Sequence, residues 1–401
     1  MLDIMPIIKT LWRNKTGPLL IVLQLSLTIA VVSNALFVVD GRIEKIERES
    51  GIAEEQIFAI WVKRTSAETD LQDIIAKDID IIRTTPGVIN ATPISSIPFS
   101  GSGSLSSLRK STEPGTVDFN TAIYELTQHG LETLGTTLIE GRNFNSNDIQ
   151  FFTRDKPPEH SVTIISKNIA EKIFPDESAL GKTVFMGNLP LTVVGVVDRI
   201  MGPWPESKSA YDVTLIPLFL KEDSTYYLVR TPIGERNSIM HALVEKLRAV
   251  DSSRLVGEEK PMAQIKRDSY SADYAMIKIL SFVIFLLTFV NALGIVGLTT
   301  FWVNQRRKQI GIRRALGSTK AAVIRYFMTE NTLLVVFAAV VGTVIAYVNS
   351  SYMVRTLGGD LLPIKYVLIT LVFLLLVTLL AAYSPVRKAA QILPVDAVSN
   401  V

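Results

Sequence analysis

The chain has 401 residues, of which 48% are hydrophobic and 20% charged, with a formal net charge of +3 and no cysteine. A disulfide framework is therefore excluded, and any exported domain must be stable from its own hydrophobic core. Residues 40–272 carry 33 acidic and 26 basic side chains, net −7, whereas the rest of the chain is net +10. The basic residues are not interleaved with aromatic ones, which argues against nucleic-acid binding.

Near the N-terminus, residues 1–16 have apolar side chains at helical spacing and basic ones between them, with Trp12 among the former. This pattern predicts a cytoplasmic amphipathic helix lying on the inner leaflet, and a disordered tail is the alternative.

Four segments contain no charged residue, and each is at least 21 residues long: Thr16–Val39, Ile279–Gln305, Asn331–Val354 and Tyr366–Val386. A bilayer core needs about 20 helical residues. Soluble buried helices rarely stay uncharged for so long. We therefore predict transmembrane helices over residues 17–40, 275–303, 328–354 and 363–385, with the last one stopped by Pro385.

Lysine and arginine cluster before the first span, between the second and third, and after the fourth. Such clusters remain in the cytoplasm. Both termini are thus predicted to be cytoplasmic, including a tail over residues 386–401, while residues 41–270 lie outside.

Two of the predicted spans carry stripes of small or weakly polar residues with a spacing of four. The first has Ser26, Ala30 and Asn34, and the third has Ala338, Gly342 and Ala346. Such stripes permit close approach of helices, and a lipid-facing Asn is costly, so we expect both faces to pack on other helices. Small residues placed there by chance are the alternative for the third span.

The external region shows two strand–helix units, in residues 41–100 and 206–270, separated by an insertion over residues 101–205. The insertion opens with a serine-rich stretch, residues 100–107, which predicts a flexible loop. The chain is therefore predicted to be an α+β membrane protein, with four transmembrane helices and a large extracytoplasmic α+β domain between spans one and two.

Between the second and third spans, Gln305 to Gly317 contains five cations and no acid. We predict a short basic helix at the cytoplasmic face, within residues 304–320. Contact with phospholipid headgroups, combined with positive-inside topology, is the alternative explanation of this cluster.

The candidate catalytic and metal-binding residues do not have the sequence spacing that such sites require. Gly181-Lys182-Thr183 resembles the end of a phosphate-binding loop, but the required earlier glycine is replaced by Asp176. The three histidines are far apart in the sequence, so no metal site is indicated. The uncharged segments contain no histidine, which argues against an ion-coupled transporter. The chain is thus expected to be non-catalytic.

Three motifs resemble the MacB-like ABC transporter permeases, the FtsX-like permease family. The first is the basic segment from Arg306 to Gly317, followed later by Glu330. The second is the C-terminal stretch from Ser384 to Val398. The third is a series of short external motifs between Leu138 and Val196. Together with the order of one span, a large external domain and three more spans, the resemblance covers almost the whole chain.

The resemblance implies that the basic segment is a coupling helix that docks on a separate ATPase. Its coupling residues would be Arg306, Arg307, Gln309, Ile310, Gly311, Ile312, Arg313, Arg314, Ala315 and Leu316, with Gly317 as the helix stop. The family usually has glutamate where this chain has Gln309, so a hydrogen bond would replace an ion pair there. Ser318 or Thr319 would cap the next helix.

The resemblance also implies a function and partners. The chain would be the permease subunit of a bacterial inner-membrane transporter, relaying ATP binding and hydrolysis to its periplasmic domains to expel a peptide, toxin, antibiotic or lipid-linked molecule. It would bind no cofactor itself, with ATP and magnesium held by the ATPase. Its partners would be two ATPases, a second permease copy or a paralogue, and a periplasmic adaptor with an outer-membrane channel. Two alternatives share this architecture, a regulator of a cell-wall hydrolase and a lipoprotein-extracting permease.

Overall fold

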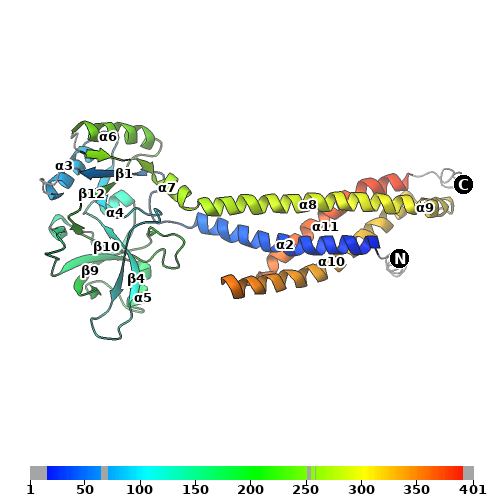
Figure 1. The fold of residues 1–401 in the computed structure, drawn as a ribbon, viewed down its shortest axis with the longest axis horizontal. Coiled ribbons are helices and arrows are strands. Elements are labelled where there is room, and N and C mark those ends of the chain that lie inside the picture. Colours follow the sequence, from blue (N-terminus) through cyan, green and yellow to red (C-terminus); the bar gives the residue numbers. More distant parts are fainter. Residues whose placement is uncertain (1–15, 65–70, 251–253, 258, 392–401) are drawn as a thin grey trace. The chain divides into compact units, whose positions relative to one another are not determined.

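The computed structural model describes residues 16–64, 71–250, 254–257 and 259–391. These form two compact units, divided between Glu47 and Arg48 and again between Ser271 and Ala272. The first contains the long helices and the second contains the strands (Figure 1). The amphipathic helix predicted over residues 1–16 and the tail beyond residue 391 lie outside the described residues, apart from residue 16.

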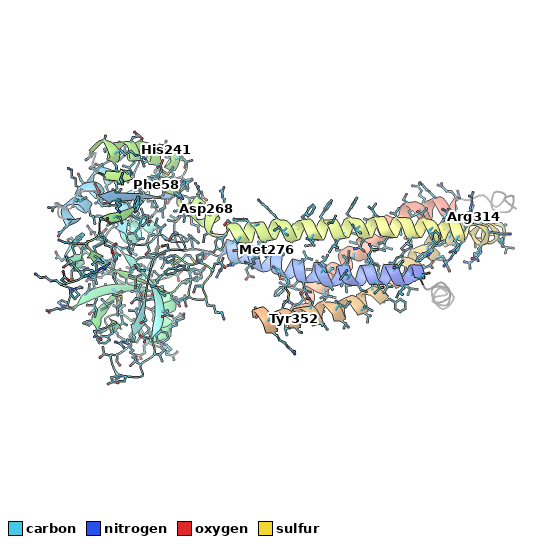
Figure 2. The ribbon with its side chains drawn as sticks, in the orientation of Figure 1. Phe58, His241, Asp268, Met276, Arg314 and Tyr352 are labelled. Atoms are coloured by element: carbon cyan, nitrogen blue, oxygen red, sulfur yellow. The ribbon has the colours of Figure 1, made fainter. Side chains whose placement is uncertain are left out.

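Four long helices in the first unit are apolar and long enough to cross a membrane. They are α2 (Thr16–Glu47), α8 (Ser271–Gln305), α10 (Lys320–Leu357) and α11 (Ile364–Ala390). Many apolar side chains on their outer faces are exposed, and Tyr352 projects away from the bundle (Figure 2). This is the pattern expected of helices whose outer faces contact lipid.

The two small-residue stripes lie against each other in the contact between α2 and α10. The Ser26 hydroxyl donates to the Ala338 carbonyl at 3.2 Å, and the Asn34 amide donates to the Ala346 carbonyl at 3.3 Å. Ala30 and Ala346 are buried in one cluster. A Cβ added at Gly342 would approach the Ile29 Cβ to 2.8 Å. The glycine is therefore required for this close approach.

Helix α8 contacts α2 through apolar side chains, with Ile295 and Trp302 buried in the cluster of Ile21, and through a few polar ones. Asn291 donates to the Thr28 hydroxyl at 2.6 Å in the middle of the helices. At one end, Asp273 forms ion pairs with both Arg42 and Lys45. The apolar face of α8 is otherwise largely exposed.

The prediction that Pro385 ends the fourth span is wrong, because α11 continues to Ala390 with Pro385 inside it. Proline removes one backbone donor, and membrane helices tolerate this when the surroundings compensate. Here Val386, Ala389 and Ala390 are buried in a cluster with Phe327 of α10, so packing offsets the lost hydrogen bond.

The second unit contains an antiparallel sheet in the order β13-β1-β12-β2, with β14 pairing with β1. Its strands are β1 (Ile57–Arg64), β2 (Asn90–Ile94), β12 (Ser224–Arg230), β13 (Arg254–Val256) and β14 (Lys260–Pro261). Helices α3 (Leu71–Arg83) and α6 (Arg236–Val250) cover one face, where Phe58, Ile60 and Tyr227 pack against α6 side chains. Helix α7 (Met262–Ser269) follows β14.

A second sheet has the order β5-β9-β7-β10-β4-β3-β8, and because β8 also pairs with β9, six of its strands close on themselves. Helix α5 (Lys167–Ile173) packs on its core, and α4 (Gly130–Leu134) lies near β2. A small third sheet pairs β6 (Gln150–Phe152) with β11 (Leu218–Leu220). The strands of the second sheet are β3 (Ser104–Arg109), β4 (Phe119–Glu125), β5 (Leu138–Gly141), β7 (Ser161–Ser166), β8 (Thr183–Met186), β9 (Leu189–Val197) and β10 (Val213–Ile216).

Two features of the second sheet differ from the expectation. The serine-rich stretch is not a loop throughout, since Ser104–Arg109 forms β3 and pairs with both β4 and β8. Leu108 explains this, because its fully buried side chain fixes the strand in the core. The sheet also continues past residue 205, where the insertion was expected to end, because β10 inserts between β4 and β7.

We predict that Gly342→Leu destabilises the contact between α2 and α10 by about 1–3 kcal/mol, the usual cost of overpacking. The thermal midpoint of the detergent-purified chain measures this. Gly297→Leu on α8 is the matched control, because a Cβ there meets nothing within 4 Å. Equal midpoints for the two variants would contradict the assignment of Gly342 as a close-contact residue.

A second prediction concerns Glu125 at the end of β4, which lines a cavity of about 200 Å³ together with Glu222. Burial, and secondly the charge of Glu222, raises the pKa of Glu125 from 4.5 to about 8. Between these two values the folded carboxyl stays protonated while the unfolded one ionises, so the carboxyl lowers stability increasingly as pH rises. Glu125→Gln should therefore be stabilising, with a gain in thermal midpoint that grows from pH 5 to pH 8. A gain that shrinks over this range would contradict the assignment.

Candidate functional site

The basic segment forms helix α9 (Arg307–Ala315) directly after α8. Hydrogen bonding continues through the junction, since the Arg306 N–H donates to the Trp302 carbonyl and the Ile310 N–H donates to the Arg306 carbonyl. Arg313 and Arg314 occupy the last turn, where positive charge stabilises the helix dipole. The helix is shorter than the predicted range of 304–320, because α8 extends to Gln305 and α10 begins at Lys320.

The connection from α9 to α10 is fixed by backbone hydrogen bonds. The Ser318 N–H donates to the Arg313 carbonyl at 3.0 Å, and the Gly317 N–H donates to the Arg314 carbonyl at 3.2 Å. Gly317 has a φ of 97°, so this is a Schellman ending with glycine in the left-handed region. The Thr319 side chain then caps α10 by accepting from the Ala322 N–H. Because two caps meet within three residues, α9 is rigidly joined to α10.

The inner side of α9 is buried in an apolar cluster. Ile310 packs with Val323 and Phe327 of α10 and with Val386 of α11. Gly311 is buried beside it. This side therefore attaches α9 to two of the long helices.

A buried ion pair joins the start of α9 to α10. One guanidinium nitrogen of Arg306, Nη1, lies 3.1 Å from Oε1 and 3.0 Å from Oε2 of Glu330. The Glu330 side chain is 1% exposed and that of Arg306 is 11% exposed. A carboxylate so deeply buried is stable as an anion only with its partner present.

The outer side of α9 combines positive charge with apolar side chains. Ile312 is 46% exposed and Leu316 is 83% exposed. The residues around them that are also exposed are Arg307, Lys308, Gln309, Arg313, Ala315 and Gly317. Exposed leucine and isoleucine among cations fit a partner groove that is apolar in the middle and acidic at its edge.

A small cleft of about 190 Å³ separates α9 from α10, and Gln309, Arg313 and Tyr326 line it. The Arg313 guanidinium lies 5.2 Å from the centre of the Tyr326 ring, a cation–π contact. The buried Nε of Arg314 has no hydrogen-bond partner among the described residues. Arg313 is therefore positioned by α10.

Sequence reasoning did not foresee the roles of Glu330 and Tyr326. Glu330 is the last acid before an uncharged run, and such an acid at the edge of a span needs a nearby cation. That signal was present. Tyr326 carried no signal, since its contact with Arg313 depends on the turn between α9 and α10.

Two families match the chain. Residues 19–245 match the MacB-like periplasmic core domain, and residues 281–394 match the C-terminal region of FtsX-like permeases. The first match covers more than half of the chain.

Similar proteins include two named as the macrolide export ATP-binding/permease protein MacB. That of Chromobacterium violaceum is 26% identical over 71% of this chain and 44% of its own length. That of Pasteurella multocida is 23% identical over 97% of this chain and 59% of its own. The chain thus spans about half the length of these relatives.

An uncharacterized ABC transporter permease, YknZ of Bacillus subtilis, is 23% identical over 64% of both chains. Among solved structures, the periplasmic region of MacB from Actinobacillus actinomycetemcomitans aligns with 54% of this chain and 94% of its own. Its TM-score is 0.36 and its identity 16%.

The buried ion pair generates a prediction. Glu330→Leu leaves the Arg306 charge buried without its partner, and should cost about 3–5 kcal/mol of stability. The double variant Arg306→Met/Glu330→Leu should recover most of this loss. The thermal midpoint in detergent measures both.

The exposed pair of Lys63 and Asp223 serves as the control, because breaking it with Asp223→Leu should cost at most about 1 kcal/mol. A double variant that is less stable than Glu330→Leu alone would show that the pair is not the interaction that Glu330 requires.

Proposed function

This chain belongs to the family of MacB-like and FtsX-like ABC transporter permeases, and from that premise we propose that it works as a mechanical relay between an ATPase and its own β-rich unit. It is a multi-pass membrane protein of the inner membrane. In the proposal, ATP binding and hydrolysis take place in a partner chain. Helix α9 receives the resulting movement.

The observation that carries this proposal is the contrast between the two sides of α9. Its inner side is held by Ile310 and by the pair of Arg306 with Glu330. Its outer side exposes Ile312 and Leu316 among cations. A helix that is fixed to α10 on its inner side and exposes a binding surface on its outer side is suited to transmit a movement of a partner to α10. A helix resting on lipid headgroups requires no such rigid attachment.

The partners follow from the relay. Two ATPase subunits, which hold ATP and magnesium, would dock on the α9 helices of a permease dimer made of two copies of this chain or of one copy and a paralogue. Both termini and α9 would then lie in the cytoplasm, with residues 48–271 on the periplasmic side. A periplasmic adaptor and an outer-membrane channel would complete an export path. The substrate class in this proposal is a peptide, toxin, antibiotic or lipid-linked molecule.

The docking face can be tested with Leu316→Asp. This residue follows the helix and is 83% exposed, so its replacement should leave the fold intact. Placing an acid at the centre of the contact should reduce co-purification of the ATPase from native membranes about tenfold or more. Arg313→Glu/Arg314→Glu should act in the same direction. Quantitative mass spectrometry of the purified complex provides the measurement.

Leu361→Asp is the matched control, since Leu361 is 56% exposed in the loop between α10 and α11, at the far end of α10 from α9. It should retain the ATPase. An equal loss of the ATPase in both leucine variants would overturn the role of α9. So would a wild-type chain with which no ATPase co-purifies. Recovery of an ATPase together with a cell-wall hydrolase would support a regulatory function in place of transport.

A further inference from the structure

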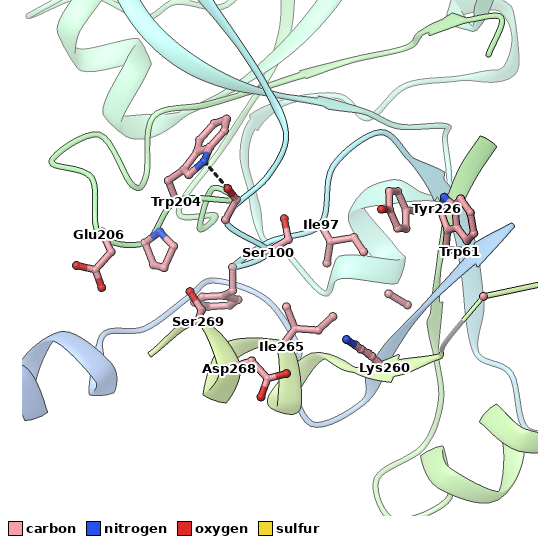
Figure 3. A pocket seen from close by; sticks show the side chains of 15 residues that line it. Trp61, Ile97, Ser100, Trp204, Glu206, Tyr226, Lys260, Ile265, Asp268 and Ser269 are labelled. Atoms are coloured by element: carbon pink, nitrogen blue, oxygen red, sulfur yellow. Dashed lines mark hydrogen bonds between the residues drawn. The ribbon is translucent and has the colours of Figure 1, made fainter. Parts of the chain in front are cut away.

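The face of the first sheet that α3 and α6 do not cover carries a pair of aromatic side chains. Trp61 on β1 and Tyr226 on β12 are directly opposite each other, and Ala59 lies two residues before Trp61 on the same face. All three line a cavity of about 770 Å³, shown in Figure 3. Cavities of 300–1,000 Å³ with mainly apolar walls are typical of sites for drug-sized molecules.

One wall of this cavity is preformed. The Trp204 indole N–H donates to the Gly101 carbonyl at 2.9 Å, as drawn in Figure 3, and the Gly101 N–H donates to the Pro203 carbonyl at 2.9 Å. These bonds tie the loop after β2 to the loop before β10. The wall therefore does not have to be ordered when a ligand enters, which reduces the cost of binding.

Phe99, in the same wall, has a strained backbone. Its φ is 66°, in the left-handed region that a bulky residue rarely adopts. The side chain is almost fully buried, and its ring centre lies 6.3 Å from that of Tyr270. Strained residues of this kind cluster at ligand-binding and switch regions of proteins. Phe99 thus contributes a strained residue to the cavity lining.

The opposite wall is formed by α7, which contributes Ile265, Asp268 and Ser269 to the cavity lining (Figure 3). The charged side chains in the lining are Asp268, Glu206 and Lys260, with a net charge of −1. Asp268 is exposed and forms no ion pair within the described part of the chain. Aromatic faces and an available carboxylate both attract a cation.

We propose that this cavity binds a drug-sized cationic amphiphile. Its apolar ring system would lie against Trp61 and Tyr226, and its amine would pair with the Asp268 carboxylate. The site goes beyond the proposed function, because a permease and a regulator could both have it and it does not depend on α9. Tyr270 alone separates α7 from α8 in the sequence, so the ligand would contact the segment that leads directly into a long helix.

The chain has no cysteine, so a single introduced cysteine is the only thiol that a maleimide can label, and its labelling rate measures the accessibility of that position. Ser269→Cys places it in the cavity, and Ser238→Cys places it at an exposed position of α6 outside the cavity lining. The full chain in detergent is labelled with a maleimide in the presence of rhodamine 6G, a cationic ring-bearing probe. At about ten times its Kd, the probe should slow labelling of Ser269→Cys about tenfold and leave Ser238→Cys unchanged.

Two further variants test the contacts. Asp268→Asn, at an exposed position that leaves the core intact, should raise the probe concentration needed for protection at Ser269→Cys by about tenfold or more. Trp61→Ala should abolish protection. Fluorescein, which is anionic, should protect neither thiol.

The proposal is overturned by unslowed labelling at Ser269→Cys, by equal slowing at Ser238→Cys, or by equal protection with fluorescein. It is also overturned if Asp268→Asn leaves the required concentration unchanged. Loss of the ATPase from α9 variants would leave all of these results intact, so failure of the proposed function and failure of this site are distinguishable.

Discussion

The close contact between α2 and α10 determines the arrangement of the other long helices. Lipid offers no hydrogen-bond partners, so Ser26 and Asn34 must find theirs in protein, and both donate to carbonyls of α10. Gly342 permits the approach that these bonds need. Helix α11 then packs against both α2 and α10, with Tyr366 and Val367 buried beside Ala30. Helix α8 joins this core through Ile295 and Trp302, which are buried in the same apolar cluster.

Helix α9 is attached to α10, the helix that forms the close contact with α2. Two adjoining caps and the pair of Arg306 with Glu330 fix α9 to α10, and the apolar cluster around Ile310 extends to α11. In the proposed relay, a displacement of α9 would be passed to α10 and, through the contact between α10 and α2, to α2. The path is a series of buried contacts within one unit, each made by named side chains.

Much of this was predictable because the bilayer constrains a sequence strongly. Uncharged length alone located four helices, and a spacing of four residues located the surfaces of α2 and α10 that meet. The basic helix followed from its cations. Local patterns did not locate β3, whose strand character depends on the burial of Leu108 by residues distant in the sequence. The same limit applies to Pro385, because the packing that allows α11 to continue comes from α10. Trp61 and Tyr226 were likewise ordinary strand residues until the register placed them opposite each other.

The topology of the first sheet has a consequence for the order of folding. Strand β1 pairs with β12, with Phe58 opposite Val229. The stretch of sequence between these two strands contains every strand of the closed second sheet. Bringing such distant segments together is entropically costly unless the interval has already become compact. The closed sheet, whose strands lie between residues 104 and 216, shortens that interval by folding on itself. If the second sheet forms first, it brings β12 close to β1 and β2. The second sheet, which interrupts the first one in the sequence, would then promote the closure of the first sheet.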